Sequence, residues 1–180
     1  MSFFATKHRT KRKIVYLNGD PNKPITASGV LIYKNVSGKM QLLIINTKNI
    51  YEDIGGKIDI DDISIYDATS REIEEETNGV IKKQDIIERI RDARYIYVPK
   101  SKYLVFIVEA LSIEKKLQKS DFGNKEIHAN INRTIGWIDK YQLSNKNIIK
   151  YKLNYRLREK QIFDTLQSIE NQFKYRKRLF

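Results

Sequence analysis

The chain has 180 residues, of which 41% are apolar and 31% charged, with eight Gly and three Pro; this composition excludes intrinsically disordered, collagen-like and low-complexity proteins. Cysteine is absent, which excludes disulfides, thiolate metal sites and cysteine nucleophiles, and the longest apolar run, Tyr103–Val108, is far shorter than the ~20 residues of a membrane span. The net charge is +12, and the N-terminus lacks the order of charged and apolar residues of a signal peptide, so we expect a soluble, cytoplasmic, single-domain protein with no membrane partner.

The first predicted elements are strands. Apolar residues predict strands over Thr26–Tyr33 and Met40–Asn46, and residues 34–39 between them have the composition of a turn. A third strand is predicted over Ile50–Ile54, where it runs into the pair Gly55-Gly56. We expect the first two strands to pair as a β-hairpin.

An amphipathic helix is predicted next, from about Ile65 to Asn78. Ser64, followed by Asp67 three residues later, has the form of a capping box and indicates where the helix begins. At ~100° per residue, the stripe predicted to be buried consists of Thr69, Ile73, Thr77 and Val80.

Glutamates crowd the neighbouring stripe of this helix. Residues three and four apart share a helix face, so Glu72, Glu75 and Glu76 project together while Glu74 points away. Three carboxylates on one face repel one another unless a cation lies among them. A hard divalent ion meets that need, and Mg²⁺ is the usual ion where phosphates are bound. Arg71, four residues before Glu75, is placed to pair with it or to brace the glutamates.

The second half of the chain adds further strands and a helix. Strands are predicted over Ala93–Val98, Tyr103–Leu111 and Thr134–Ile138. From about Leu153 to Phe173, apolar residues recur near helical spacing and predict a C-terminal helix. Strands with helices before and after them predict a layered α/β (α+β) domain.

The glycine pair and the acidic helix together resemble the Nudix box, whose pattern is Gly, five residues, Glu, seven residues and Arg-Glu-apolar-any-Glu-Glu-any-Gly. Gly56 begins the box, Asp62 stands at its first Glu, and residues 71–76 match its core. The sequence departs from the pattern in three ways. Asp62 is a shorter carboxylate, eight residues separate it from the arginine, and Asn78 replaces the closing glycine. Asn tolerates the left-handed conformation that a helix end requires.

The resemblance extends over residues 25–140. Residues 25–33 resemble the first core strand of Nudix domains, and residues 125–127 and 136–139 resemble the late acidic residue and the Trp-bearing strand. The resemblance implies a Nudix-like α/β/α sandwich with a mixed sheet and a C-terminal helix. The expected division is a basic N-terminal arm (1–24), a Nudix hydrolase core (25–140) and a basic C-terminal helical extension packed on the core (141–180).

The resemblance also implies a metal site. Nudix hydrolases cleave a diphosphate linked to another group by attack of water on phosphorus, with Mg²⁺, for which Mn²⁺ substitutes. Glu75 and Glu76 would bind the metal directly, and the Gly55 carbonyl would add a ligand. Glu72 and Glu126 would each be a further ligand or the general base.

Two carboxylates compete for the role of general base. Glu72 and Glu126 are both implied as the catalytic base, and the choice between them stays open. Arg71 would orient the glutamates. Substrate contacts are expected from Lys57, Lys100, Lys102 and Tyr103. Beside these lysines, Tyr95, Tyr97 and Tyr103 either form a wall for bases and phosphates or, as alternating aromatics of a strand, pack in the interior.

The substrate class depends on the distribution of charge. Residues 1–24 carry a net charge of +5 and residues 141–180 of +7, whereas the segment between them is neutral. Two basic ends favour a polyanionic partner, so we expect a Mg²⁺-dependent pyrophosphohydrolase of nucleoside-diphosphate-linked substrates, with capped or 5′-phosphorylated RNA (decapping) as one class. The alternative class comprises free or oxidised nucleoside triphosphates, dinucleoside polyphosphates and diphosphoinositol phosphates. A second alternative is a non-catalytic RNA-binding Nudix module. The pattern predicts no oligomeric state.

Overall fold

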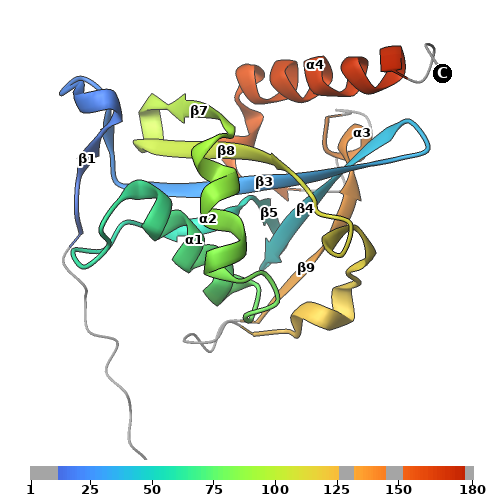
Figure 1. The fold of residues 1–180 in the computed structure, drawn as a ribbon, viewed down its shortest axis with the longest axis horizontal. Coiled ribbons are helices and arrows are strands. Elements are labelled where there is room, and N and C mark those ends of the chain that lie inside the picture. Colours follow the sequence, from blue (N-terminus) through green and yellow to red (C-terminus); the bar gives the residue numbers. More distant parts are fainter. Residues whose placement is uncertain (1–11, 126–131, 145–151, 177–180) are drawn as a thin grey trace, which may run out of the picture.

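The computed structural model describes residues 12–125, 132–144 and 152–176. They form an eight-stranded mixed β-sheet with helices on both faces (Figure 1), and the first two strands form a separate two-stranded sheet. The strands are β1 (Val15–Tyr16), β2 (Pro24–Ile25), β3 (Ala27–Val36), β4 (Lys39–Thr47), β5 (Ile50–Glu52), β6 (Ile54–Lys57), β7 (Arg94–Val98), β8 (Tyr103–Glu109), β9 (Arg133–Asp139) and β10 (Lys152–Leu153). The α-helices are α1 (Ile65–Glu76), α2 (Lys83–Arg91), α3 (Lys140–Ser144) and α4 (Lys160–Arg176). The 3-10 helices are η1 (Leu17–Gly19), η2 (Pro99–Ser101), η3 (Glu114–Lys116), η4 (Lys119–Phe122) and η6 (Tyr155–Arg158). The predicted α/β architecture with a mixed sheet and a C-terminal helix is confirmed.

The predicted hairpin is present and is formed by β3 and β4. The two strands pair antiparallel up to Val36 and Lys39, and the central residues of the turn, Ser37 and Gly38, both have positive φ. A two-residue turn of this kind matches the twist of the flanking strands. On its other edge β3 pairs parallel with β8, which pairs with β7.

The hairpin strands separate at the other end, and the chain that follows them fills the gap. β3 pairs with β4 from Ile32 onward but with β6 from Ala27 to Val30. β4 in turn pairs with β5 from Ile45 to Thr47. Residues 50–57, which include the glycine pair, therefore lie between the two long strands.

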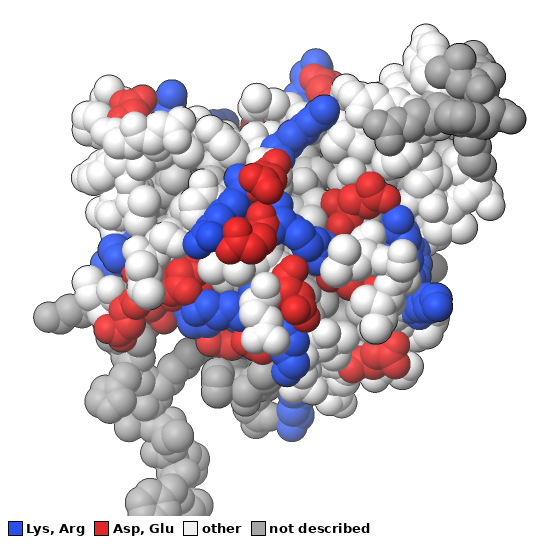
Figure 2. Space-filling view, viewed as in Figure 1, with Lys and Arg blue, Asp and Glu red and all other residues white. Residues whose placement is uncertain are grey.

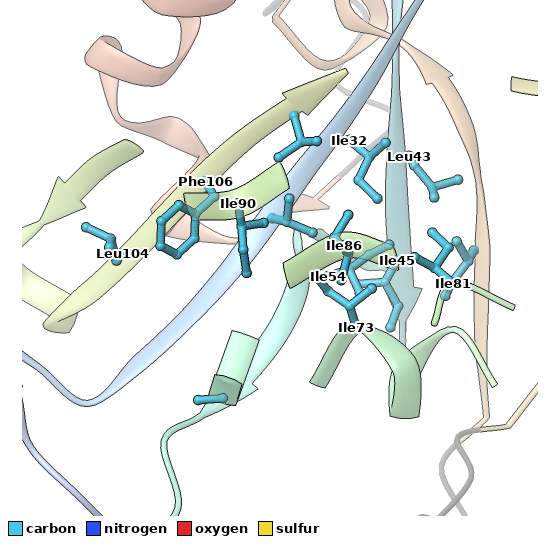
Figure 3. Close-up of a cluster of buried hydrophobic side chains, with 14 of the residues drawn as sticks. Ile32, Leu43, Ile45, Ile54, Ile73, Ile81, Ile86, Ile90, Leu104 and Phe106 are labelled. Carbon is cyan, nitrogen blue, oxygen red and sulfur yellow. The ribbon is translucent and has the colours of Figure 1, made fainter. Parts of the chain in front are cut away.

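Two apolar cores hold the helices against the sheet. On one face, α1 and α2 contribute Ile73, Ile86 and Ile90 to a cluster with β3, β4, β6 and β8 (Figure 3). On the other face, Leu157 and α4 residues such as Leu166 pack in a second cluster with residues of β3, β4, β7 and β8. Within the part of the chain that the structure describes, no helix has the length and apolar character needed to cross a bilayer.

Three features differ from the predicted elements. The predicted helix from Leu153 to Phe173 begins only at Lys160, because β10 pairs parallel with β5 and η6 follows it. The strand predicted over Ile50–Ile54 is interrupted at Asp53. Helix α2 was not predicted, although two of its isoleucines lie four residues apart on one buried face.

Candidate active site

The acidic helix α1 is positioned by its cap and its buried stripe. The hydroxyl of Ser64 accepts a hydrogen bond from the Asp67 amide at 3.1 Å, so the predicted helix start is confirmed. Thr69 and Ile73 are fully buried, and the Thr69 hydroxyl lies 2.6 Å from that of Ser28 on β3. This contact ties the middle of the helix to the strand that borders the glycine pair.

The glycine pair Gly55-Gly56 lies on strand β6 and faces two glutamates of α1. The Gly55 amide donates to the Glu76 carboxylate at 2.7 Å. A Cβ atom added to Gly56 would overlap the carboxylate of Glu72. The missing side chain of Gly56 therefore makes the space that this carboxylate occupies.

Arg71 forms the centre of the acidic cluster. Its Nε and Nη2 donate to the two carboxylate oxygens of Asp62 at 2.9 and 3.0 Å, and Nη2 also donates to the Lys57 carbonyl at 3.1 Å. Its Nη1 donates to Glu72 at 3.0 Å and lies 3.4 Å from both oxygens of Glu75. One guanidinium thus links the loop before the helix to two of the helix glutamates.

This environment shifts the pKa of two groups. Burial raises the pKa of Glu72 to about 7, against the opposing effect of Arg71 and with smaller contributions from Glu75 and Asp59. Burial lowers the pKa of Arg71, but the carboxylates around it outweigh burial and the net shift is upward. Arg71 is therefore charged at any working pH, whereas Glu72 can exchange a proton near neutrality.

The residues expected to hold Mg²⁺ offer oxygen donors only. One helix presents the carboxylates of Glu72, Glu75 and Glu76, and Gly55 lies on the strand that Glu76 contacts. Hard divalent cations prefer such donors, so the set fits Mg²⁺ in type. Among the described residues, no three Asp, Glu or His side chains form a ready group for a metal ion, and the arginine holds two of the carboxylates instead. Glu126 lies outside the described residues.

The lysines expected to contact substrate lie at one end of the sheet. Lys57 and Tyr103 both pair with Ala27, from opposite edges of β3, so Lys57 and Lys102 flank the start of that strand. Both lysines, and Lys100, are exposed. The expectation that Tyr103 contacts substrate is wrong, and the packing alternative holds for it: its side chain is only 2% exposed, and its hydroxyl donates to Asp53 in the interior.

The N-terminal segment reaches this site, which the sequence did not predict. The Lys13 amide donates to the Ile58 carbonyl at 3.2 Å, and its ammonium donates to the Asp62 carbonyl at 2.6 Å. The backbone of Arg12 forms an isolated antiparallel β-bridge with that of Asp59. Two basic residues of the N-terminal arm therefore lie beside the acidic loop. Figure 2 shows that basic and acidic side chains are intermingled on the face that carries α1 and α2, so no single sign dominates it.

Comparison with known proteins adds little. No protein-family model matches the chain, and no curated protein matches it significantly. Among solved structures, a C. elegans Ap4A hydrolase crystallised in a binary complex is similar, with 17% sequence identity and a TM-score of 0.42 over 87% of this chain and 99% of that one. At this identity and TM-score, the likeness assigns no function to this chain.

Proposed function

We propose that this protein is a Nudix hydrolase, a Mg²⁺-dependent pyrophosphohydrolase that cleaves nucleoside-diphosphate-linked substrates. The observation that carries the proposal is the contact between α1 and the glycine pair, where Glu76 accepts a hydrogen bond from the Gly55 amide and Glu72 faces Gly56. The Nudix resemblance assigns metal binding and proton transfer to these same residues. An acidic helix with only a solvated surface role would need no such contact.

Each residue of the site has a part in the proposed reaction. Glu75, Glu76 and the Gly55 carbonyl would hold Mg²⁺, which when bound neutralises phosphate oxygens and lowers the pKa of the attacking water. Glu72 is the candidate base among the described residues, because its carboxylate lies against Gly56 and burial raises its pKa toward the range useful for proton transfer. Glu126 remains the competing base.

A hydrolysis assay tests this proposal. The purified chain is incubated with Mg²⁺ in ¹⁸O-labelled water and with capped RNA, nucleoside triphosphates, dinucleoside polyphosphates or diphosphoinositol phosphates. We expect cleavage of at least one class, with ¹⁸O entering one phosphate product. Activity should disappear with a chelator and in Glu75→Gln. Turnover that survives both treatments, or no cleavage of any class by the folded protein, would refute the assignment.

Within this function, RNA-linked diphosphates are the substrate class that we favour. The support is the placement of basic residues: Lys57 and Lys102 flank the start of β3, and Arg12 and Lys13 border the acidic loop. A short nucleotide occupies the catalytic centre alone, whereas a polynucleotide extends onto such a rim and gains from counterion release. The alternative classes remain free or oxidised nucleoside triphosphates, dinucleoside polyphosphates and diphosphoinositol phosphates.

Salt dependence distinguishes the two classes. Neutralising both Lys57 and Lys102 to Gln should weaken RNA binding and lower the slope of log affinity against log salt by about 0.7 per lysine. The matched control neutralises Lys39 and Lys48, which are both exposed: Lys39 is the first residue of β4, and Lys48 lies in the turn after that strand. Equal RNA affinity in the two double variants would favour small nucleotides. RNA binding without hydrolysis would favour the non-catalytic module.

A further inference from the structure

A charged network is buried behind the glycine pair, on the face of the sheet opposite α1. Asp53, between β5 and β6, is 0% exposed. It accepts a hydrogen bond from the Tyr103 hydroxyl at 2.8 Å. It also accepts from Arg156, whose Nε and Nη2 lie 3.3 and 3.2 Å from its second oxygen. The arginine is 103 residues away along the chain.

Arg156 is held in this position by several contacts. It belongs to η6, directly after β10, which pairs with β5. Its Nη2 also contacts Glu52 at 3.1 Å, and its guanidinium lies 4.1 Å from the centre of the Tyr103 ring. Burial lowers the pKa of Arg156, but Asp53 and the other anionic neighbours outweigh this effect and raise it. The C-terminal segment thus delivers a permanent positive charge to the interior.

The network fills the space immediately behind the glycine pair. A Cβ atom added to Gly29 would overlap the Tyr103 hydroxyl and the Asp53 carboxylate. A Cβ atom added to Gly55 would overlap the backbone of Gly29 and lie 2.8 Å from the Tyr103 hydroxyl. The backbone of Gly55 therefore lies between this hydroxyl on one side and the carboxylate of Glu76 on the other.

We propose that Arg156 is a positioning residue for the glycine pair. By neutralising Asp53 and holding it against Tyr103, it fixes the position of the β6 backbone that presents Gly55 to the metal. This inference rests on the proposed function and deepens it. The C-terminal segment is then part of the catalytic apparatus, although none of its described side chains enters the acidic cluster around Arg71.

The physical reason is the cost of an uncompensated buried charge. Without Arg156, Asp53 keeps the hydrogen bond from Tyr103 but loses its countercharge, and an uncompensated buried charge is strongly unfavourable. The segment that carries Asp53 is then expected to shift toward water, and Asp53 is only two residues before Gly55. Outer partners that orient metal ligands typically change metal affinity 10–100-fold when they are removed.

The test compares Arg156→Met with Arg158→Met. Arg158 lies in the same 3-10 helix and donates to the Leu153 carbonyl at 3.1 and 2.7 Å, so it controls for loosening of the segment. Three quantities are measured on the full chain: hydrogen exchange of residues 53–57, Mn²⁺ affinity by electron paramagnetic resonance, and the midpoint of thermal unfolding. Arg156→Lys keeps the charge, and Tyr103→Phe removes one hydrogen bond to Asp53.

We expect Arg156→Met to accelerate exchange of residues 53–57 and to weaken Mn²⁺ binding by roughly 10–100-fold, with partial recovery in Arg156→Lys. Arg158→Met should change neither. Equal exchange and equal Mn²⁺ affinity in the two Met variants would overturn the proposal, even if Arg156→Met unfolds earlier, because a purely structural role lowers only the unfolding midpoint.

Two other outcomes are also informative. If Arg156→Met does not fold, Tyr103→Phe decides: unchanged exchange and unchanged Mn²⁺ affinity in that variant would overturn the proposal, and losses of the same kind would support it. If the unmodified chain binds no Mn²⁺ and hydrolyses nothing, the proposed function fails, and with it the metal part of this inference. The hydrogen-exchange data then report separately whether Arg156 fixes the backbone of residues 53–57.

Discussion

Alanine at Gly56 displaces one carboxylate without removing it. The added Cβ atom would lie 2.7 Å from Glu72 Oε1 and closer still to the rest of the carboxylate, whereas an ordinary contact begins at 3.4 Å. Gly56 does not have the positive φ that disfavours side chains, so alanine suits the backbone. The carboxylate is the far end of a flexible side chain and is expected to retreat by about 1 Å.

The two consequences of this shift differ in size. A displacement of about 1 Å at a reacting group costs roughly 10²-fold in turnover, or ~2.7 kcal/mol in activation free energy. Replacing Gly by Ala stabilises the folded state by ~0.4–1 kcal/mol through the unfolded chain, which offsets the cost of moving Glu72. The free energy of unfolding should therefore change by less than about 1 kcal/mol, which corresponds to less than ~4 °C in the unfolding midpoint.

The assay measures kcat and the unfolding midpoint of Gly56→Ala and Gly136→Ala. Gly136, on β9, has no atom within 4 Å of an added Cβ atom, so its variant controls for the chemical change itself. We expect the turnover of Gly56→Ala to be about 1% of that of Gly136→Ala, with similar midpoints. Equal turnover would refute the placement of Glu72 at the reacting centre, and a collapse in stability would show that Glu72 does not yield to the new methyl group.

The remaining predictions concern the acidic residues and their arginine. Glu75→Gln and Glu76→Gln should each abolish hydrolysis and leave the circular dichroism spectrum unchanged, because a lost ligand charge weakens Mg²⁺ binding directly; wild-type turnover in either would remove the metal assignment. Glu126→Gln should lower turnover by at least ~10²-fold, and a change of only a few fold would leave Glu72 as the base. Arg71→Met should lower the free energy of unfolding by ~3–5 kcal/mol in chemical denaturation, because it leaves Asp62, which is only 4% exposed, without its countercharge. A loss below ~1 kcal/mol would mean that solvent screens the Arg71–Asp62 pair.

Local patterns were sufficient to predict the acidic helix and its surroundings. The Ser64 cap, the buried stripe through Thr69 and Ile73, and the hairpin turn all depend on residues within a few positions of one another. The helix ends at Glu76, two residues before the predicted end, and Asn78 has a φ of 57°, the left-handed conformation that its residue type was predicted to tolerate. Short-range hydrogen bonds and helical periodicity are encoded in the order of the residues.

Only the tertiary structure decided which distant charges meet. Nothing near Asp53 in the sequence indicates that its partners are Tyr103 and Arg156, or that Lys13 reaches the loop of Asp62. The pairing of β10 with β5, which brings Arg156 to Asp53, is likewise a long-range contact. A buried charge needs a partner of opposite charge, but any chain segment can supply it. Sequence therefore determined which groups could do chemistry, while packing of the two ends against the core determined what surrounds them.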